Sequence, residues 1–429
     1  MMRRNGTAIL LFVAMAWTVA ATRAQSPRGH DWPQWQGPQR DNRCFEKGLL
    51  QSWPAKGPKL FWAVTGIGEG YSAPTVAQGR VFGLSYRGDR EVVWALNAAN
   101  GEELWTKPIA AANRQIEFNQ GSRSSVTVDG EYLYALGVSG DLACLRAKDG
   151  ALVWRCNLVS DYGGVIPKYK DSYGYAESPL VHEDWTVVTP GGVRNTMVAL
   201  AKSTGKLVWR ASVPETAYKG ASRASFSSIV AGDFTGAVEF VQFLQGGLVG
   251  ITERGELSWR WNKPSSDVVN CVTPLISRNT VFATSAYGKG CGLARIELSA
   301  RGNTVASEIY FNKNMKNGHG GVVLLEDTLY GGSDPGMLVC LDFRSGKTRW
   351  QERTPGLGAI IAADGVLYYR NEDGVMFLIQ ANPVNYNELG RFTPAHRSQH
   401  KAWSHPVIAH GKLYLRDQDA LCVYDIRSK

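Results

Sequence analysis

A glycine followed four residues later by a tryptophan recurs along this chain and constrains its fold more than any other feature. The pairs are Gly101 and Trp105, Gly150 and Trp154, Gly205 and Trp209, Gly255 and Trp259, and Gly346 and Trp350. Each pair belongs to a segment that reads as strand, tight turn and returning strand, as in residues 199–209. A single hairpin is only marginally stable in water, so the repeated hairpins must pack on one another.

A second hairpin precedes each of these units. In the first unit, residues 72–76 turn at Gln78-Gly79 into residues 80–84. The equivalent turns carry residues that tolerate turn geometry, namely Gly130, Asp184, Asp233, Asn279, Asp327, Gly365 and Gly411. The eight first hairpins recur at intervals of about 38 to 54 residues. Four strands per unit at this period predict an all-β chain, folded as a single eight-bladed β-propeller of four-stranded antiparallel blades.

The order of the strands predicts how the ring closes. An outer strand at 59–62 comes before any hairpin, and the last unit, 405–424, ends after its third strand. We therefore expect the N-terminal strand to complete the last blade, so that both ends of the chain close the ring and hide its sheet edges. The expected organisation is a signal peptide at 1–24, a lead-in segment at 25–54 and the propeller at 55–429.

The first residues predict export. Arg3 and Arg4 precede an apolar segment at 8–21, and Thr22-Arg23-Ala24 fits a small-residue cleavage site. The apolar segment is shorter than the roughly 20 residues that span a bilayer, so we expect no transmembrane segment once the signal is removed. The first cysteine, Cys44, lies far from the cleavage site, which argues against a lipoprotein. The expected product is a soluble monomer in the periplasm or outside the cell.

The charge pattern argues against nucleic acid as a partner. The net charge is +9, and loss of Arg3, Arg4 and Arg23 with the signal lowers it to +6. The remaining Lys and Arg residues are scattered rather than clustered, so the sequence does not support nucleic-acid binding.

The seven cysteines are an odd number, so at least one is free or pairs between chains. Cys144, Cys340 and Cys422 occupy the repeat position that alanine fills elsewhere, which predicts buried core positions. Cys271 and Cys291 fall within one repeat and could form a disulfide in an oxidising compartment.

The repeated pattern Ala-Leu-x-Ala-x-x-Gly-x-x-x-Trp resembles the PQQ-like repeats of quinoprotein dehydrogenase-type propellers. It is also similar to the repeats of the propeller lipoprotein of the outer-membrane barrel-assembly machinery. The resemblance covers most of residues 55–427. Residues 31–38, 175–179 and 310–315 look similar to a group of exported bacterial propellers that have no settled activity. The resemblance therefore implies a fold without deciding a function.

The tryptophans invite a ligand-binding interpretation, but one indole per blade at a fixed position is what packing between neighbouring blades requires. We expect these side chains to be structural, with each indole N–H bound to the backbone. They are Trp62, Trp105, Trp154, Trp209, Trp259 and Trp350.

Residues that break the repeat near the expected central channel are the better candidates for function. In propellers, the segments before the inner strands and the loops between the second and third strands emerge on one face, here called the loop face. Aromatic side chains, histidines and charges of both signs converge there, which is typical of a binding pocket. The candidates are Glu177, Arg223, Asn270, His319, Trp403, His405, Asp417 and Asp419.

The resemblance to quinoprotein dehydrogenases implies PQQ and Ca²⁺, with Glu, Asn and Asp as oxygen ligands, an Arg beside the quinone and a Trp under its plane. Hard oxygen ligands suit Ca²⁺. The matching residue types here are Glu177, Asn270, Arg223 and Trp403, with Asp417 or Asp419 as a further carboxylate. The adjacent Cys-Cys pair and the long roofing insertions of many such enzymes are absent from the sequence. A structural ion pair between Glu177 and Arg223 is the competing interpretation.

The sequence therefore favours an exported, non-catalytic binding or scaffold propeller that recognises an envelope protein or a glycan through its loop face. A PQQ- and Ca²⁺-dependent oxidoreductase, similar to alcohol dehydrogenases, is the alternative. A hydrolase or lyase of polysaccharides is a third hypothesis. No H-E-x-x-H, G-x-S-x-G or phosphate-binding glycine loop occurs.

Overall fold

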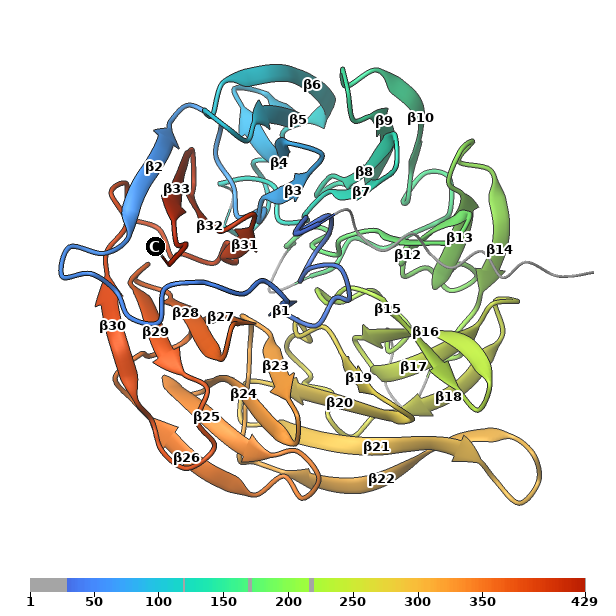
Figure 1. Cartoon of the computed structure of the whole chain (residues 1–429). Helices are drawn as coiled ribbons and strands as arrows, with labels where there is room; N and C mark the ends of the chain where they lie inside the picture. The colour runs from blue at the N-terminus through green and yellow to red at the C-terminus, as the bar shows by residue number, and fades with distance from the viewer. Residues whose placement is uncertain (1–28, 119, 169–171, 216–219, 429) are drawn as a thin grey trace, which may run out of the picture.

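Eight antiparallel sheets form a ring around a central axis (Figure 1). This computed structural model describes residues 29–118, 120–168, 172–215 and 220–428, so the expected signal peptide at 1–24 lies outside the described residues. Within them the chain forms strands and turns but no α-helix, and hence no helix that could cross a membrane. The prediction of a single eight-bladed β-propeller is confirmed.

We name the blades A to H in chain order. Blade A contains β3 (Thr75–Ala77), β4 (Arg80–Arg87), β5 (Arg90–Asn97) and β6 (Glu103–Ala111). Blade B contains β7 (Thr127–Asp129), β8 (Tyr132–Leu136), β9 (Asp141–Arg146) and β10 (Leu152–Asn157). Blade C contains β11 (Leu180–His182), β12 (Trp185–Val188), β13 (Met197–Ala201) and β14 (Leu207–Ala211). Blade D contains β15 (Val230–Phe234), β16 (Ala237–Leu244), β17 (Gly247–Thr252) and β18 (Leu257–Trp261).

The second half of the ring follows the same plan. Blade E contains β19 (Leu275–Ser277), β20 (Thr280–Ser285), β21 (Gly290–Leu298) and β22 (Thr304–Asn312). Blade F contains β23 (Val322–Leu325), β24 (Thr328–Ser333), β25 (Met337–Asp342) and β26 (Thr348–Glu352). Blade G contains β27 (Gly358–Ala363), β28 (Val366–Asn371), β29 (Met376–Gln380), β30 (Glu388–Phe392) and the short parallel strand β1 (Arg43–Cys44). Blade H contains β31 (Val407–Ala409), β32 (Lys412–Asp417), β33 (Ala420–Asp425) and β2 (Lys59–Val64).

The strand β2 closes the ring as the sequence predicts. It pairs antiparallel with β33, from Lys59 opposite Asp425 to Val64 opposite Leu421. Blade H is therefore built from both ends of the chain, and its outer edge is supplied by the residues that precede blade A. Because β2 pairs with β33, the edge of β33 is not exposed where the ring closes. This removes a site for edge-to-edge association with another chain.

Position in a blade decides how a strand is buried. The central strand β13 is buried along most of its length because its blade is sandwiched between two others. The outer strand β14 is only partly buried: Leu207 and Val208 are exposed, whereas Trp209 is only 8 % exposed. The hydrophobic core is thus a series of clusters between adjacent blades, rather than one central mass.

The repeat tryptophans of blades H, A, B and C each pack on the turn glycine of the next blade. Such pairs are Trp62 on Gly101, Trp105 on Gly150, Trp154 on Gly205 and Trp209 on Gly255. A methyl group at the first three of these glycines would lie 2.6–2.8 Å from indole carbons, closer than van der Waals contact allows. Each glycine also has a φ between +70° and +79°, which disfavours other residues. Glycine is therefore required twice over at this position.

Most of these indoles also donate a hydrogen bond to the next blade. The acceptors are the carbonyls of Ala98 for Trp62 (3.1 Å), Ala147 for Trp105 (3.2 Å), Lys202 for Trp154 (2.8 Å) and Asn382 for Trp350 (2.8 Å). Trp259 bonds to Glu239 within its own blade. Trp209 has no hydrogen-bond partner for its N–H among the described residues.

Blade E shows that the contact matters more than the residue that makes it. Ala306 stands where the repeat expects tryptophan, but Tyr310, farther along β22, contacts Gly346 of blade F instead. The Tyr310 hydroxyl donates to the carbonyl of Phe343 at 3.0 Å. A second aromatic residue thus supplies both the packing and the hydrogen bond that the drifted repeat has lost.

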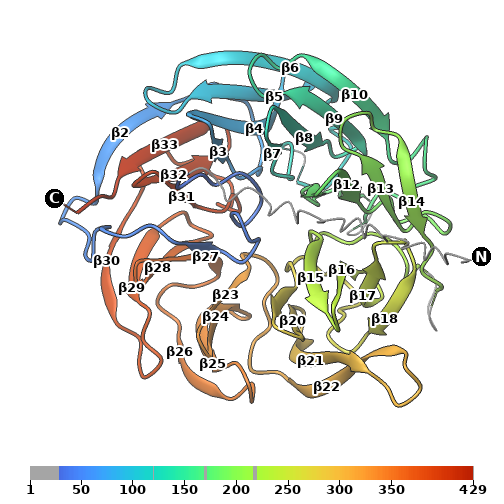
Figure 2. The ribbon, with the colours of Figure 1, turned by 45° about the vertical axis from the view of Figure 1, so that its right-hand side comes forward.

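The lead-in segment, residues 29–54, crosses the middle of the ring, where it is the blue segment in Figures 1 and 2. Trp32 forms an antiparallel bridge with Val76, and Arg43–Cys44 pairs parallel to β27. The segment contacts every blade: Val76 in A, Val128 in B, Pro179 in C, Ile229 in D, Thr273 in E, Val322 in F, Ala362 in G, and His405 and His410 in H. It fills the axis with the chain's own residues.

All seven cysteines are free thiols. The disulfide that the sequence allowed between Cys271 and Cys291 is therefore not formed, and that hypothesis is wrong for this structure. Cys291 is fully buried in the core of blade E and its Sγ lies 3.3 Å from Asn312 Oδ1. Burial raises the pKa of both thiols to about 12, which makes them weak nucleophiles.

The glycine contact predicts the outcome of two alanine substitutions. Gly205→Ala adds a methyl group against Trp154 and strains a φ of +70°, whereas Gly365→Ala strains a φ of +79° with open space around it. We expect Gly205→Ala to lower the free energy of unfolding by about 3 kcal/mol and Gly365→Ala by about 1 kcal/mol. Urea denaturation followed by tryptophan fluorescence measures both. Equal losses would show that the indole contact contributes nothing beyond backbone strain.

Candidate functional site

Glu177 lies just before β11 and is 2 % exposed. Its Oε2 accepts the N–H of Thr189 at 3.0 Å, while Oε1 has no hydrogen-bond partner among the described residues. Burial raises the pKa of Glu177 to about 8, although the hydrogen bonds from Thr189 and the charge of Arg40 oppose the shift. Glu177 is therefore largely protonated at neutral pH.

The positive charge that acts on the pKa of Glu177 is that of Arg40 in the lead-in segment. Arg40 was not a candidate from the sequence. Its guanidinium donates to the carbonyls of Ser178 (3.2 Å), Pro179 and Ile229 (2.8 Å), which tie blade C to blade D. Burial lowers the pKa of Arg40 to about 9. The competing interpretation of a Glu177–Arg223 ion pair is wrong, because Arg223 is exposed and makes no such pair among the described residues.

Asn270 is fully buried and its side chain is saturated with hydrogen bonds. Its Oδ1 accepts from the Ser266 N–H and the Ser285 hydroxyl, both at 2.9 Å. Its Nδ2 donates to the carbonyl of Leu244 at 3.0 Å and to Ser265 Oγ at 3.1 Å. The side chain therefore shapes the loop between blades D and E, and a metal ion would have to replace these internal bonds.

The two candidate aspartates have separate roles. Asp417, at the end of β32, is buried and lies between Arg397 and Arg370, whose Nη2 is 3.2 Å from Asp417 Oδ2. Its Oδ1 accepts the Ser398 N–H at 3.1 Å. Asp419 is exposed and accepts the N–H of Gly66 at 3.3 Å. Both carboxylates hold loops in place.

Glu177, Asn270, Asp417 and Asp419 do not fit PQQ and Ca²⁺. The side-chain oxygens of Asn270 and Asp417 already bind internal partners, and Asp419 faces solvent. Beside Glu177 the channel holds Arg40, a cation that competes with a calcium ion for the same carboxyl group. The oxygen donors that a Ca²⁺ ion needs are thus not brought together in an available form.

Trp403 anchors a group of aromatic rings on the loop face. Its ring centroid lies 5.2 Å from Tyr71 and 4.8 Å from Phe118. Phe118 also contacts Tyr173 at 6.0 Å, and Tyr173 contacts Phe226 at 4.6 Å. These five rings, which we call the aromatic cluster, precede the inner strands of blades A, B, C, D and H. Phe118 is 40 % exposed, so the cluster reaches the surface.

Polar groups border the aromatic cluster. The Trp403 N–H donates to Glu372 Oε1 at 2.8 Å, and His319 Nε2 lies 3.2 Å from the same oxygen. Burial alone would raise the pKa of Glu372, but hydrogen bonds from His319 and Trp403 hold it at about 2. Lys401 Nζ lies 3.4 Å from Glu372 Oε2. The cluster is thus flanked by a fixed negative charge and an exposed positive one.

His405 is buried deeper, against the lead-in segment. Its ring centroid lies 4.3 Å from that of Trp35, and its Nδ1 has no hydrogen-bond partner among the described residues. Burial lowers the pKa of His405 to about 3, with a smaller contribution from His319. The imidazole is therefore neutral and serves as a packing surface for the lead-in segment.

Sequence reasoning identified Trp403 and His319 but missed Phe118, Phe226 and Arg40. Phe118 and Phe226 lie in segments that do not follow the repeat, so their aromatic character was the only signal that could have identified them. Arg40 lies in the lead-in segment, whose route through the channel has no periodic signal.

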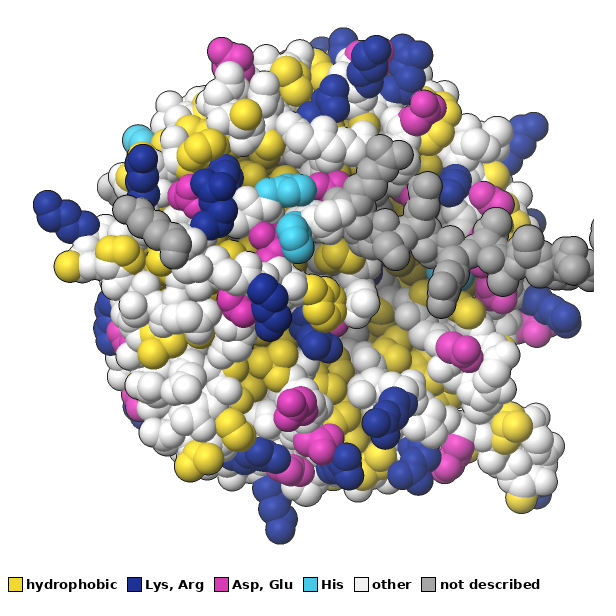
Figure 3. All heavy atoms as spheres, in the orientation of Figure 1, with side chains coloured by type: hydrophobic (Ala, Val, Ile, Leu, Met, Phe, Trp, Pro, Cys, Tyr) yellow, Lys and Arg dark blue, Asp and Glu magenta, His cyan; other side chains and the backbone are white. Residues whose placement is uncertain are grey.

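The opposite face, with the turns between first and second strands, carries a hollow of about 1310 Å³. Asp31, Gln78 and His410 line it, and Asp31 Oδ1 lies 2.7 Å from His410 Nε2. Figure 3 shows Lys and Arg side chains interspersed with Asp and Glu over one face of the molecule. The scattered charge seen in the sequence is thus also scattered in space there.

A family model described as outer membrane protein assembly factor BamB matches residues 41–160, 89–352 and 297–385. The chain belongs to the BamB family. BamB of Shewanella oneidensis is 25 % identical over 313 residues, which cover 68 % of this chain and 70 % of that protein. The matches begin within the lead-in segment, extend through blades A to F and end in blade G before β30.

Solved structures share the architecture. BamB from Moraxella catarrhalis is 16 % identical with a TM-score of 0.55, covering 80 % of this chain and 95 % of that one. A quinohemoprotein alcohol dehydrogenase from Comamonas testosteroni is 12 % identical with a TM-score of 0.60, covering 93 % and 81 %. Because both similarities lie far below 25 % identity, they show the fold and leave the function to the site.

Glu177 predicts a dependence of stability on pH. Because its pKa is about 8 in the fold and about 4.5 in the unfolded chain, the folded state binds more protons between these values. Stability contributed by Glu177 is therefore complete below about pH 4.5 and is lost as the pH rises toward 8. We expect Glu177→Gln to reduce the fall in urea midpoint over this range. Glu102→Gln, on the surface, is the control; an unchanged profile in Glu177→Gln would contradict the assignment.

Proposed function

We propose that this protein is a non-catalytic scaffold of the cell envelope that binds a protein partner on its loop face, centred on the aromatic cluster. The observation that carries the proposal is the convergence of five aromatic side chains from five blades on one partly exposed position. Aromatic residues surrounded by polar groups are the residues that dominate the free energy of protein association.

The geometry around the cluster suits a polypeptide. Trp403 and Phe118 offer apolar area, while Lys401 and Asp373 lie at the edge with 52 % and 79 % of their side-chain surface exposed. Glu372 fixes the indole through its N–H, so the ring is pre-oriented before a partner arrives. Pre-orientation lowers the entropy that association must overcome.

The filled channel supports binding rather than catalysis. Arg40, Gln36 and Asn42 of the lead-in segment are each at most 5 % exposed. They lie where a ring-shaped fold would otherwise leave room for a cofactor on its axis. The candidate oxygen donors Asn270 and Asp417 are engaged in internal bonds, so they are not available to hold a cofactor on the axis.

Relatives support the class of partner. The matched family and the relative from Shewanella oneidensis carry the description outer membrane protein assembly factor. We infer that this chain likewise works in the envelope, where it meets other proteins, and that the signal-like N-terminal residues export it.

The partner can be captured by crosslinking. A photoreactive amino acid in place of Asp373 sits beside the cluster without occupying it, and crosslinked partners in intact cells are identified by mass spectrometry. We expect one dominant protein. Binding of that purified protein should weaken at least 30-fold in Trp403→Ala or Phe118→Ala, because truncating an interface anchor costs about 2 kcal/mol or more.

Phe45→Ala is the matched control, since Phe45 is 53 % exposed but lies on the lead-in segment outside the cluster. Its affinity should equal that of the unaltered protein. Loss of binding in the control alone, or binding to glycans but not to any protein on the loop face, would contradict the proposal.

A cofactor titration tests the alternative function. Tryptophan fluorescence and dye reduction are followed while PQQ and Ca²⁺ are added at micromolar concentration, with a functional quinoprotein dehydrogenase as positive control. We expect no saturable change, because Asn270 and Asp417 are committed to internal hydrogen bonds. Saturable binding together with dye reduction would overturn the assignment as a non-catalytic scaffold.

A further inference from the structure

At the junction between blades C and D, as at that between D and E, the indole of the outer strand donates no hydrogen bond to the next blade within the part of the chain that the structure describes. Trp209 packs on Gly255, but its indole N–H has no partner among the described residues. The turn of blade D is also shorter. The Gly255 N–H bonds three residues back to Thr252, whereas Gly205 closes the corresponding turn of blade C four residues back, on Ala201.

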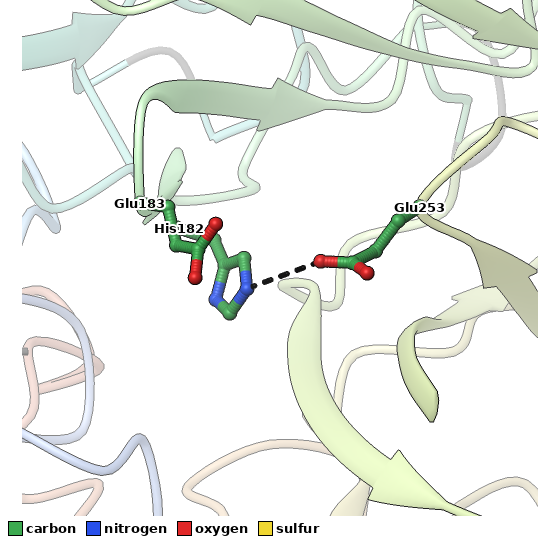
Figure 4. Close-up of side chains that lie close together, drawn as sticks. All are labelled: His182, Glu183 and Glu253. Atoms are coloured by element: carbon green, nitrogen blue, oxygen red, sulfur yellow. Dashed lines mark ion pairs between the residues drawn. The ribbon is translucent and has the colours of Figure 1, made fainter. Parts of the chain in front are cut away.

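At this same junction three side chains with metal-binding groups come together (Figure 4). His182 ends β11 and Glu183 follows it in the turn of blade C, while Glu253 lies in the shortened turn of blade D. One ligand atom from each of the three lies within 4.8 Å of the others. The His182 ring points toward Glu253, with Nε2 3.8 Å from Glu253 Oε1.

The His182 imidazole is held in place by packing, and its Nε2 is available to a ligand. The His182 ring lies edge-on to Phe240, with centroids 5.4 Å apart. Its Nε2 is buried yet makes no hydrogen bond within the described residues. A buried polar atom without a partner costs free energy, and binding a cation is one way to remove that cost.

The carboxylates are also uncommitted to cations. Among the described residues, Glu183 forms no ion pair and Glu253 pairs only with His182. The nearby Lys202 is bound instead to Asp129 at 2.9 Å and to Asp184 at 3.9 Å. The two carboxylates can bring a charge of −2, which matches a divalent ion, and the imidazole adds a nitrogen ligand.

We propose that His182, Glu183 and Glu253 form a binding site for a divalent transition metal, with Zn²⁺ as the best-suited ion, that joins blades C and D. A nitrogen ligand disfavours Mg²⁺ and Ca²⁺, and one imidazole with two carboxylates suits Zn²⁺. Ligand atoms of a tetrahedral zinc site lie about 3.4 Å apart, so the three side chains, whose ligand atoms lie within 4.8 Å of one another, must draw closer on binding. Water completes the fourth position.

The metal would add a connection between these blades where the indole hydrogen bond is missing. Ligands from two blades cannot both bind unless the blades are docked, so metal binding favours the closed ring. The site lies on the face of the first-to-second strand turns. It is therefore separate from the loop face, and it does not depend on the proposed scaffold function.

The test is a titration of tag-free protein with Zn²⁺ against a chromophoric chelator. We expect one ion per chain, with the affinity reduced at least tenfold in His182→Ala and in Glu253→Gln. Glu326→Gln is the control, because Glu326 occupies the same left-handed turn position in blade F as Glu183 does in blade C. Its affinity should be unchanged. Absence of stoichiometric binding, or equal binding in all variants, would overturn the proposal.

Two further readouts separate this site from adventitious binding. Co²⁺ at the site should give visible absorption without a thiolate charge-transfer band, because no cysteine belongs to the set; a thiolate band would assign the ion to a cysteine and contradict the proposal. Zn²⁺ should raise the thermal midpoint of the unaltered protein reversibly with EDTA, and not that of Glu253→Gln. An equal rise in both proteins would also contradict it.

Discussion

The contact between an indole and the turn glycine of the next blade is the interaction on which this ring depends. A four-stranded blade cannot bury its faces alone, so each must find the next one in a fixed orientation. The glycine has no side chain, so the indole can pack directly on the backbone. The hydrogen bond from the indole N–H fixes the position of one blade along the strands of the next. Tyr310 makes the same contact in blade E, which shows that geometry rather than residue identity is maintained.

The lead-in segment adds a second constraint at the axis. By touching all eight blades it ties the ring from the inside, and Arg40 bonds across the gap between blades C and D with a fully buried guanidinium. The same segment takes up the position near Glu177 that the quinoprotein hypothesis requires for a cofactor. Because these residues occupy the axis, the side chains available to a partner are those of the aromatic cluster on the loop face.

Departures from the repeat mark the places with functional potential. Trp403 and Glu372 lie where loops from different blades converge, and their side chains are oriented by hydrogen bonds rather than by the repeat. At the junction of blades C and D, the turn at Gly255 is shorter and the Trp209 N–H has no partner among the described residues. In both places a regular contact is missing or replaced, and polar groups gather there.

The sequence by itself determined the number of blades, the closure by the strand predicted at 59–62 and the buried position of the repeat tryptophans, because these follow from local periodicity. Only the tertiary structure decided which side chains meet at the axis. Asn270 looked like a ligand but is saturated, and Glu177 faces Arg40 rather than Arg223. The physical reason is that these contacts join segments far apart in the chain, through a lead-in segment that has no period of its own.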